Sequence, residues 1–126
     1  MRKQVIICVD DEPIILDSLL NQLQSLFGEE YIYEVAENAL DALELIEEMK
    51  SEGFTIKTVI SDYLMPGMKG DDFMIQLNLR YPLIQKVMLT GHMDENTMSR
   101  TMRQANLTSC IRKPWTQQQL FSVLRG

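Results

Sequence analysis

The sequence is poor in the residues that build disulfide frameworks and zinc sites. It contains two cysteines and one histidine among 126 residues. Cys8 and Cys110 stand inside predicted strands and lack the spacing of metal ligands, so we expect both to be buried, reduced thiols. His92 stands alone in a predicted loop, where a histidine is usually solvated. These shortages argue against a disulfide-stabilised fold and against zinc.

Long hydrophobic runs and an excess of basic charge are also missing. Residues 1–4 are followed by only five apolar residues before two aspartates, too few for a signal-peptide core or a membrane-spanning helix. We therefore expect a soluble, cytoplasmic protein that makes no membrane contact. Eighteen acidic residues outnumber twelve basic ones, and the net charge of −6 opposes attraction to a phosphate backbone. Direct binding of nucleic acid is not expected.

What the sequence does contain is a regular alternation of apolar runs and amphipathic segments. No repeat, low-complexity tract or linker interrupts it, so we expect one domain over residues 1–126. Strands are expected at 4–9, 31–36, 57–61, 86–89 and 109–112, and helices at 13–28, 38–53, around 73–79, at 94–106 and from 116 onward. Five such units predict an α/β fold, a parallel sheet with right-handed crossovers and helices on both faces.

Polar side chains follow four of the five predicted strands. Asp10 and Asp11 follow the first, Asp62 the third, Thr90 the fourth and Lys113 the fifth. In a flavodoxin-like, doubly wound (βα)5 sheet of order 2-1-3-4-5, the first and third strands are neighbours, which would bring the three aspartates together. Carboxylates about 4 Å apart repel by roughly 4 kcal/mol per pair at an effective dielectric near 20, so they need a cation. Oxygen ligands without nearby Cys or His favour Mg²⁺.

Each of these residues also has a simpler interpretation when it is taken alone. Asp10 and Asp11 could cap the first helix, Thr90 could belong to a turn, and Lys113 could be an exposed residue at a strand end. Their joint occurrence at the ends of parallel strands is what favours a common site.

Four segments together resemble the receiver domain of two-component response regulators, and the resemblance covers essentially the whole chain. They read V-I-I-C-V-D-D-E-P at 5–13, V-I-S-D-Y-L-M-P-G at 59–67, M-L-T-G at 88–91 and I-R-K-P-W at 111–115. The resemblance implies that Asp62 accepts a phosphoryl group from a sensor histidine kinase or a histidine phosphotransfer protein. A carboxylate can act as such a nucleophile.

The same resemblance assigns roles around Asp62. Asp11, Asp62 and the backbone carbonyl of Leu64 would ligate Mg²⁺, while Asp10 would act mainly through bound water. Thr90 would hydrogen-bond one phosphoryl oxygen and Lys113 would pair with another. The bond between Lys113 and Pro114 would be cis.

Two positions depart from the family pattern. Many receiver domains carry Tyr or Phe three positions before the lysine, where the ring turns inward as the threonine moves; here that position is Cys110. Coupling from Thr90 to the fifth strand must then be weaker or use other packing, for which Trp115 is a candidate. Leu64 places an apolar side chain at a site entrance that is often polar, which should alter water access.

The expected output is a conformational switch rather than enzymatic turnover of a substrate. Phosphorylation would add about −1.5 to −2 charges and bias a two-state equilibrium, with self-catalysed phosphotransfer and autodephosphorylation as the only chemistry. An output domain or a partner would bind the face from the fourth to the fifth helix, where Met93, Met98 and Met102 are candidate contacts. A phosphorylation-dependent homodimer is another possibility, and the chain could be a stand-alone receiver or one excised from a longer regulator.

Two other functions remain open on the same fold. A phosphorylation-independent binding module would be marked by loss of an acidic or lysine site residue, and none is lost here. An aspartyl-phosphate phosphatase normally needs a second acid two residues after the nucleophile, and that position is Leu64. A flavodoxin or dinucleotide-binding protein is disfavoured because Asp10 and Asp11 would repel a nucleotide phosphate.

Overall fold

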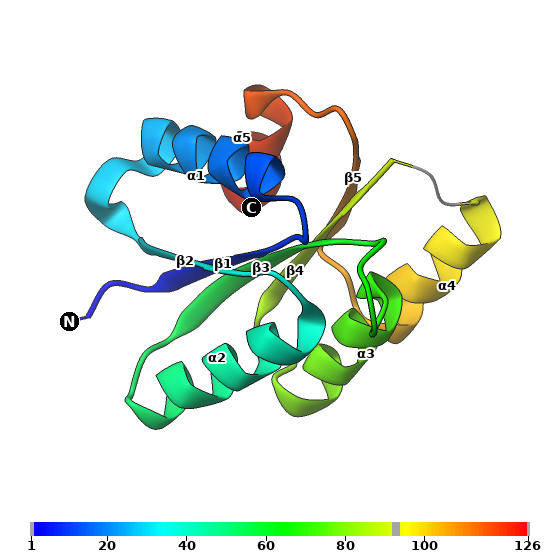
Figure 1. Ribbon diagram of the computed structural model, residues 1–126, viewed down its shortest axis with the longest axis horizontal. Coiled ribbons are helices and arrows are strands. Elements are labelled where there is room, and N and C mark those ends of the chain that lie inside the picture. Colours follow the sequence, from blue (N-terminus) through cyan, green and yellow to red (C-terminus); the bar gives the residue numbers. More distant parts are fainter. Residues whose placement is uncertain (1, 92–93, 126) are drawn as a thin grey trace.

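A computed structural model of the chain describes residues 2–91 and 94–125, and a parallel five-stranded sheet lies at its centre (Figure 1). The strand order is β2-β1-β3-β4-β5, which confirms the predicted doubly wound, flavodoxin-like topology. The strands are β1 (Val5–Val9), β2 (Ile32–Ala36), β3 (Ile56–Asp62), β4 (Gln85–Thr90) and β5 (Ser109–Arg112). His92 and Met93 lie outside the described residues.

Helices cover both faces of this sheet. They are α1 (Pro13–Phe27), α2 (Ala39–Ser51), α3 (Gly70–Arg80), α4 (Glu95–Gln104) and α5 (Gln117–Arg125), and a short 3₁₀ turn, η1 (Gly28–Glu30), follows α1. Figure 1 shows α1 and α5 together on one face, with α2, α3 and α4 on the other. The molecule therefore has three layers, as the five strand–helix units predict.

Strand β1 shows why the central strands read as uninterrupted apolar runs. All five of its residues are buried, because helices cover both of its faces. Its side chains alternate between two hydrophobic clusters: Val5, Ile7 and Val9 join the cluster under α2 and α3, whereas Ile6 and Cys8 join the cluster under α1 and α5. A strand packed on both sides is held firmly, and so is the residue that follows it.

The ends of several helices follow the expected capping chemistry. The Asn38 side chain accepts a hydrogen bond from the backbone N–H of Asp41 at 2.8 Å, at the start of α2. Thr116 accepts one from the N–H of Gln119 at 3.1 Å, just before α5. Pro13 occupies the first turn of α1, where its missing N–H costs nothing. These features account for backbone N–H groups that the first turn of a helix leaves without intrahelical partners.

Helix α4 is packed less deeply than the other helices. Thr101 is the one buried residue that α4 contributes among the described positions, because the helix contains no Leu or Ile to place in the core. Met98 is half-buried, while Met102 is 38% exposed. The helix therefore keeps part of its apolar surface available on the outside of the fold.

Cys110 differs from the expectation that both cysteines are buried. Cys8 is fully buried in β1, but Cys110 is only half-buried. It lies in β5, which is at the edge of the sheet and pairs only with β4, opposite Met88. An edge strand has no neighbour on its outer side, so a small side chain there stays partly open to solvent.

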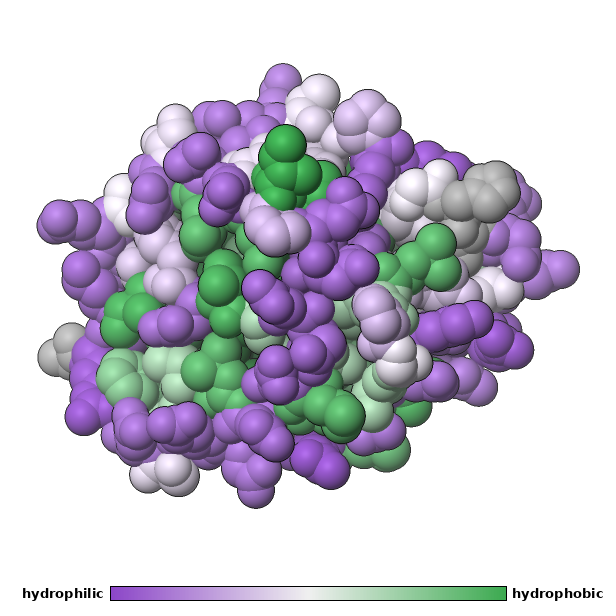
Figure 2. Space-filling model, viewed as in Figure 1, coloured by the Kyte–Doolittle hydropathy of each residue, from purple (hydrophilic) through white to green (hydrophobic). Residues whose placement is uncertain are grey.

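On the face seen in Figure 2, hydrophilic residues predominate around the periphery and hydrophobic residues gather toward the middle. The middle corresponds to the region of Figure 1 where the sheet lies between the two helical layers. Within the described residues, no helix has the length and apolar character needed to cross a membrane.

Candidate functional site

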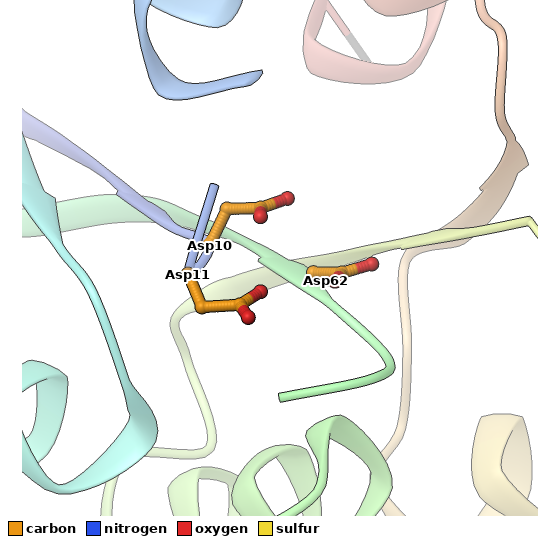
Figure 3. Close-up of side chains that lie close together, drawn as sticks. All are labelled: Asp10, Asp11 and Asp62. Atoms are coloured by element: carbon orange, nitrogen blue, oxygen red, sulfur yellow. The ribbon is translucent and has the colours of Figure 1, made fainter. Parts of the chain in front are cut away.

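Three aspartates meet at the carboxyl end of the sheet. Asp10 directly follows β1 and is fully buried, Asp62 is the last residue of β3 and is 5% exposed, and Asp11 is exposed. Because β1 and β3 pair side by side, with Val9 opposite Ser61, their ends lie next to each other. One carboxylate oxygen from each aspartate lies within 4.8 Å of the others. Figure 3 shows the three side chains close together and pointing in the same general direction.

Lys113 lies between two of these carboxylates. Its Nζ is 2.9 Å from Asp62 Oδ1 and 3.3 Å from Asp10 Oδ2. The residue follows the edge strand β5, and its backbone N–H donates to the Thr90 carbonyl at 2.9 Å, which joins the ends of β5 and β4. The Lys113–Pro114 peptide bond is cis, as the family resemblance implies. The lysine thus reaches the aspartates from the far edge of the sheet.

Burial and neighbouring charges shift the pKa values of both Asp10 and Lys113. Burial raises the pKa of Asp10, and the charge of Asp62 adds to the rise, against the opposing Glu12 N–H and Lys113. For Lys113, burial favours the neutral amine, but the hydrogen bond and charge of Asp62, together with the charge of Asp10, give a raised pKa. Lys113 is therefore held as a cation, and its single positive charge does not balance the negative charges of the carboxylates around it.

The predicted residues Thr90 and Leu64 lie at the same place. A hollow of about 230 Å³ is lined by residues at the ends of four strands: Asp11, Glu12, Asp62, Tyr63, Leu64, Thr90, Gly91 and Lys113. Thr90, the last residue of β4, is almost fully buried, while the Leu64 side chain is 58% exposed. The hollow therefore has a carboxylate, a hydroxyl and an ammonium on its walls and an apolar side chain in its rim.

Gly70 is a further residue of the site, and the sequence interpretation missed it. Its N–H donates to the Tyr63 carbonyl at 2.8 Å, at the first turn of α3. A Cβ at this position would overlap the backbone carbonyl of Asp62 and would come within 2.7 Å of the Tyr63 Cα. Only glycine lets α3 approach the Asp62 backbone so closely. A glycine shortly before the predicted helix was the available signal.

The donor set fits a hard divalent cation. Asp10, Asp11 and Asp62 supply oxygen ligands only, and Asp11 faces solvent, so that water could complete the coordination. Lys113 neutralises only part of the charge of three carboxylates. The acidic cluster can therefore bind a metal, and its chemistry suits Mg²⁺ rather than zinc.

Comparison with known sequences decides the family. The sequence profile of the response regulator receiver domain matches residues 6–125. The chain belongs to this family. It is thus a receiver domain of two-component signalling, which confirms the resemblance carried by the four sequence segments.

Two proteins that resemble this chain are much longer than it is. The hydrogenase transcriptional regulatory protein HoxA of Cupriavidus necator is 24% identical over 98% of this chain, and the sensor kinase CckA of Brucella abortus is 26% identical over 95% of it. The chain spans 24% of the length of the first protein and 12% of the second.

The fold agrees with solved receiver structures. The signal receiver domain of an HD domain-containing protein from Pseudomonas fluorescens matches with a TM-score of 0.85 and 27% identity. The match covers 98% of this chain and 93% of that one. The three-layer architecture is therefore that of a receiver domain.

Proposed function

We propose that Asp62 is the phosphoacceptor of this receiver domain and that its phosphoryl donor is the phosphohistidine of a sensor histidine kinase or a histidine phosphotransfer protein. The observation that carries the proposal is the 2.9 Å ion pair between Asp62 and Lys113, at the mouth of a hollow that Thr90 also lines. A carboxylate nucleophile, a cation and a hydroxyl then surround the position that a transferring phosphoryl group would take.

The transfer balances without any further reactant. A carboxylate oxygen of Asp62 forms a bond to phosphorus while the phosphorus–nitrogen bond of the donor imidazole breaks, and that bond's electron pair stays on the imidazole nitrogen. Lys113 pairs with the negative charge of the phosphoryl oxygens, and Thr90 donates its hydroxyl hydrogen to one of them. The product is an aspartyl phosphate, which water can later hydrolyse.

Asp10, Asp11 and Asp62 would hold Mg²⁺, with the Leu64 carbonyl as an additional ligand. When bound, the ion supplies the positive charge that screens the carboxylates from the incoming phosphoryl group. Burial raises the pKa of Asp10, and a bound cation would offset this unfavourable burial of its charged form. Without such an ion, three acids and one lysine would repel the donor.

The switch would act on another part of a longer protein or on a separate partner. A phosphoryl group adds about −1.5 to −2 charges beside Asp10, so Lys113 must redistribute its ion pairs. The shallow packing of α4 makes the face from α4 through β5 to α5 the proposed contact surface for an output domain, a partner or a second copy. This proposal covers residues 1–126 as one receiver unit.

The two alternatives are weaker on this structure. A phosphorylation-independent binding module has no need for Lys113 to be ion-paired with both Asp10 and Asp62, yet both pairs are present. A phosphatase with an aspartyl intermediate needs a second acid at position 64, where the exposed side chain is leucine. Leu64→Asp would supply that acid, and phosphatase turnover only in this variant would agree with the switch function of the native chain.

The proposal is tested by phosphorylation with a small phosphodonor such as acetyl phosphate, with and without Mg²⁺. We expect the intact mass to rise by one phosphoryl group only when Mg²⁺ is present, and the fluorescence of Trp115 to change with it. Asp62→Asn should abolish both effects, whereas Asp17→Asn, on the exposed side of α1, should keep them. Absence of any adduct in the native protein with Mg²⁺ contradicts the proposal.

A further inference from the structure

The position of Lys113 poses a structural problem for the proposed phosphoacceptor site. Its ammonium has to remain between Asp10 and Asp62, yet the residue follows β5, a four-residue strand at the sheet edge. Its backbone N–H donates to the Thr90 carbonyl, and α5 begins only at Gln117. The loop between Lys113 and α5 therefore needs a contact with another part of the fold that holds it in place.

The side chain of Trp115 supplies a contact of the required kind. Its indole Nε1–H donates to Oε1 of Gln22 on α1 at 2.6 Å, a short hydrogen bond for this pair of groups. The ring packs against the cluster under α1 and α5, as does the partly buried Ile15. An indole has a single donor and no acceptor, so one bond with a fixed direction satisfies it.

A second, longer contact joins the same two parts of the fold. Gln117 Nε2, at the start of α5, donates to the Ser25 hydroxyl on α1 at 3.4 Å. A hollow of about 360 Å³ lies along this junction, lined by three residues of α1 and three of the loop: Ile15, Ser18, Gln22, Lys113, Pro114 and Trp115. Because the junction is not filled by side chains, the hydrogen bond of Trp115 is its main directional contact.

We propose that Trp115 and Gln22 are positioning residues for Lys113. Their hydrogen bond fixes the loop after β5 against α1, so that the ammonium of Lys113 faces Asp62. The inference rests on the proposed phosphoacceptor function of Asp62. It also gives a route for the signal: a shift of Lys113 on phosphorylation moves Trp115 against α1, on the opposite face of the sheet from α4.

This route compensates for the missing aromatic ring on β5. Cys110 is small and half-buried, so it has no large side chain to reorient when Thr90 moves. Trp115 follows Lys113 in the sequence, whereas Cys110 precedes it. The hydrogen bond to Gln22 anchors Trp115 to α1, the helix that begins directly after Asp10, Asp11 and Glu12. Asp10 and Asp11 thus lead into the start of α1, and Trp115 is hydrogen-bonded to Gln22 further along the same helix.

A double-mutant cycle tests the pair. Gln22→Leu removes the acceptor, and Trp115→Phe keeps an aromatic ring but removes the donor. Each single variant should lower the initial rate of phosphorylation by acetyl phosphate and Mg²⁺ by about five- to tenfold, the worth of one lost hydrogen bond. The double variant should be no slower than either single one, because both remove the same contact. Gln24→Leu, at an exposed position of α1, is the matched control and should keep the native rate.

If the hydrogen bond between Trp115 and Gln22 only stabilised the fold, the variants would behave differently. A purely stabilising role predicts a lower melting temperature but an unchanged rate per folded molecule, and an indole N–H resonance of Trp115 that does not respond to beryllofluoride with Mg²⁺. We expect this resonance to shift in the native protein and to lose its response in Gln22→Leu. Native rates in both single variants overturn the positioning role while leaving the function of Asp62 intact. A native protein that takes up no phosphoryl group overturns both.

Discussion

Two lysines lie at opposite ends of the same sheet, one half-buried and one fully buried, and their surroundings differ in kind. Lys113, at the carboxyl end, is ion-paired with Asp62 and Asp10. Lys86, near the amino end of β4, is 1% exposed, and its Nζ donates to the Ile84 carbonyl at 2.7 Å and to the Pro82 carbonyl at 3.5 Å. The pKa of Lys113 is raised, whereas burial lowers the pKa of Lys86.

The difference shows what separates a functional end of the sheet from a structural one. At the amino end, a lysine closes the turn between α3 and β4 by binding neutral carbonyls. At the carboxyl end, three acids are brought so close together that one lysine cannot balance them. Burial of unbalanced charge costs stability, so such a cluster points to a ligand that completes it.

The largest expected effect separates the two lysines by function. Lys113→Met should lower the rate of phosphorylation by a small phosphodonor by about 10²- to 10³-fold, the usual loss for one group that stabilises transition-state charge. Lys86→Met is the matched control and should keep the native rate, because its side chain lies at the other end of β4. Initial rates from intact-mass measurements check this. Equal losses in both variants would show that the effect is one of folding.

The next largest effect concerns the packing behind Asp62. Gly70→Ala should destabilise the protein by about 1–3 kcal/mol, the cost of forcing a methyl group into an occupied space. The Asp62 backbone should be displaced as well, so the affinity for Mg²⁺ should fall. Gly91→Ala is the control for stability, because no described residue other than its chain neighbours lies within 4 Å of its added Cβ. Urea unfolding and Mg²⁺ titration measure both effects; an unchanged Gly70→Ala protein would refute the close approach of α3.

A smaller effect is the pH dependence of stability at the amino end. Because the pKa of Lys86 is lowered in the folded state, the unfolded chain binds more protons just below pH 10.5. The contribution of Lys86 to stability should therefore rise with pH through that window. Lys86→Met should remove this rise while changing stability at pH 7 by about 1 kcal/mol or less. The difference between the unfolding free energies of the two proteins across pH 7–10 measures it, and a difference that does not vary with pH would contradict it.

The smallest expected effect is chemical and leaves stability unchanged. Burial raises the pKa of the Cys8 thiol to about 12 and also raises that of Cys110, which is half-buried at the sheet edge. In the folded protein a thiol reagent should modify Cys110 slowly and Cys8 hardly at all. Both should react in denaturant. Rapid modification of Cys8 in the folded protein would mean that β1 is not closed on both faces.

Much of this organisation could be predicted because it depends on local patterns. Continuous apolar runs identified strands covered on both faces, and the polar residues after them identified the end of the sheet where Asp10, Asp11 and Asp62 meet. The strand order could only be assumed from the sequence, and the structure confirms it. Element boundaries moved by a residue or two, for example at Asp62, which belongs to β3 itself.

The remaining features depend on contacts between distant residues, which periodicity does not encode. Lys86 looked like an ordinary residue at the start of a strand, and its burial follows from the turn whose carbonyls it binds. The bond between Trp115 and Gln22 joins positions that are 93 residues apart. Cys110 was expected to be buried, but its exposure depends on its place at the open edge of the sheet.

The most direct test of the account is to locate the phosphoryl group on the chain. After treatment with acetyl phosphate and Mg²⁺, borohydride reduces an aspartyl phosphate to the corresponding alcohol, homoserine, and peptide mass spectrometry then identifies the converted residue. We predict conversion at Asp62 alone, dependent on Mg²⁺. Conversion at Asp10 or Asp11, or no conversion at all, would contradict the central claim.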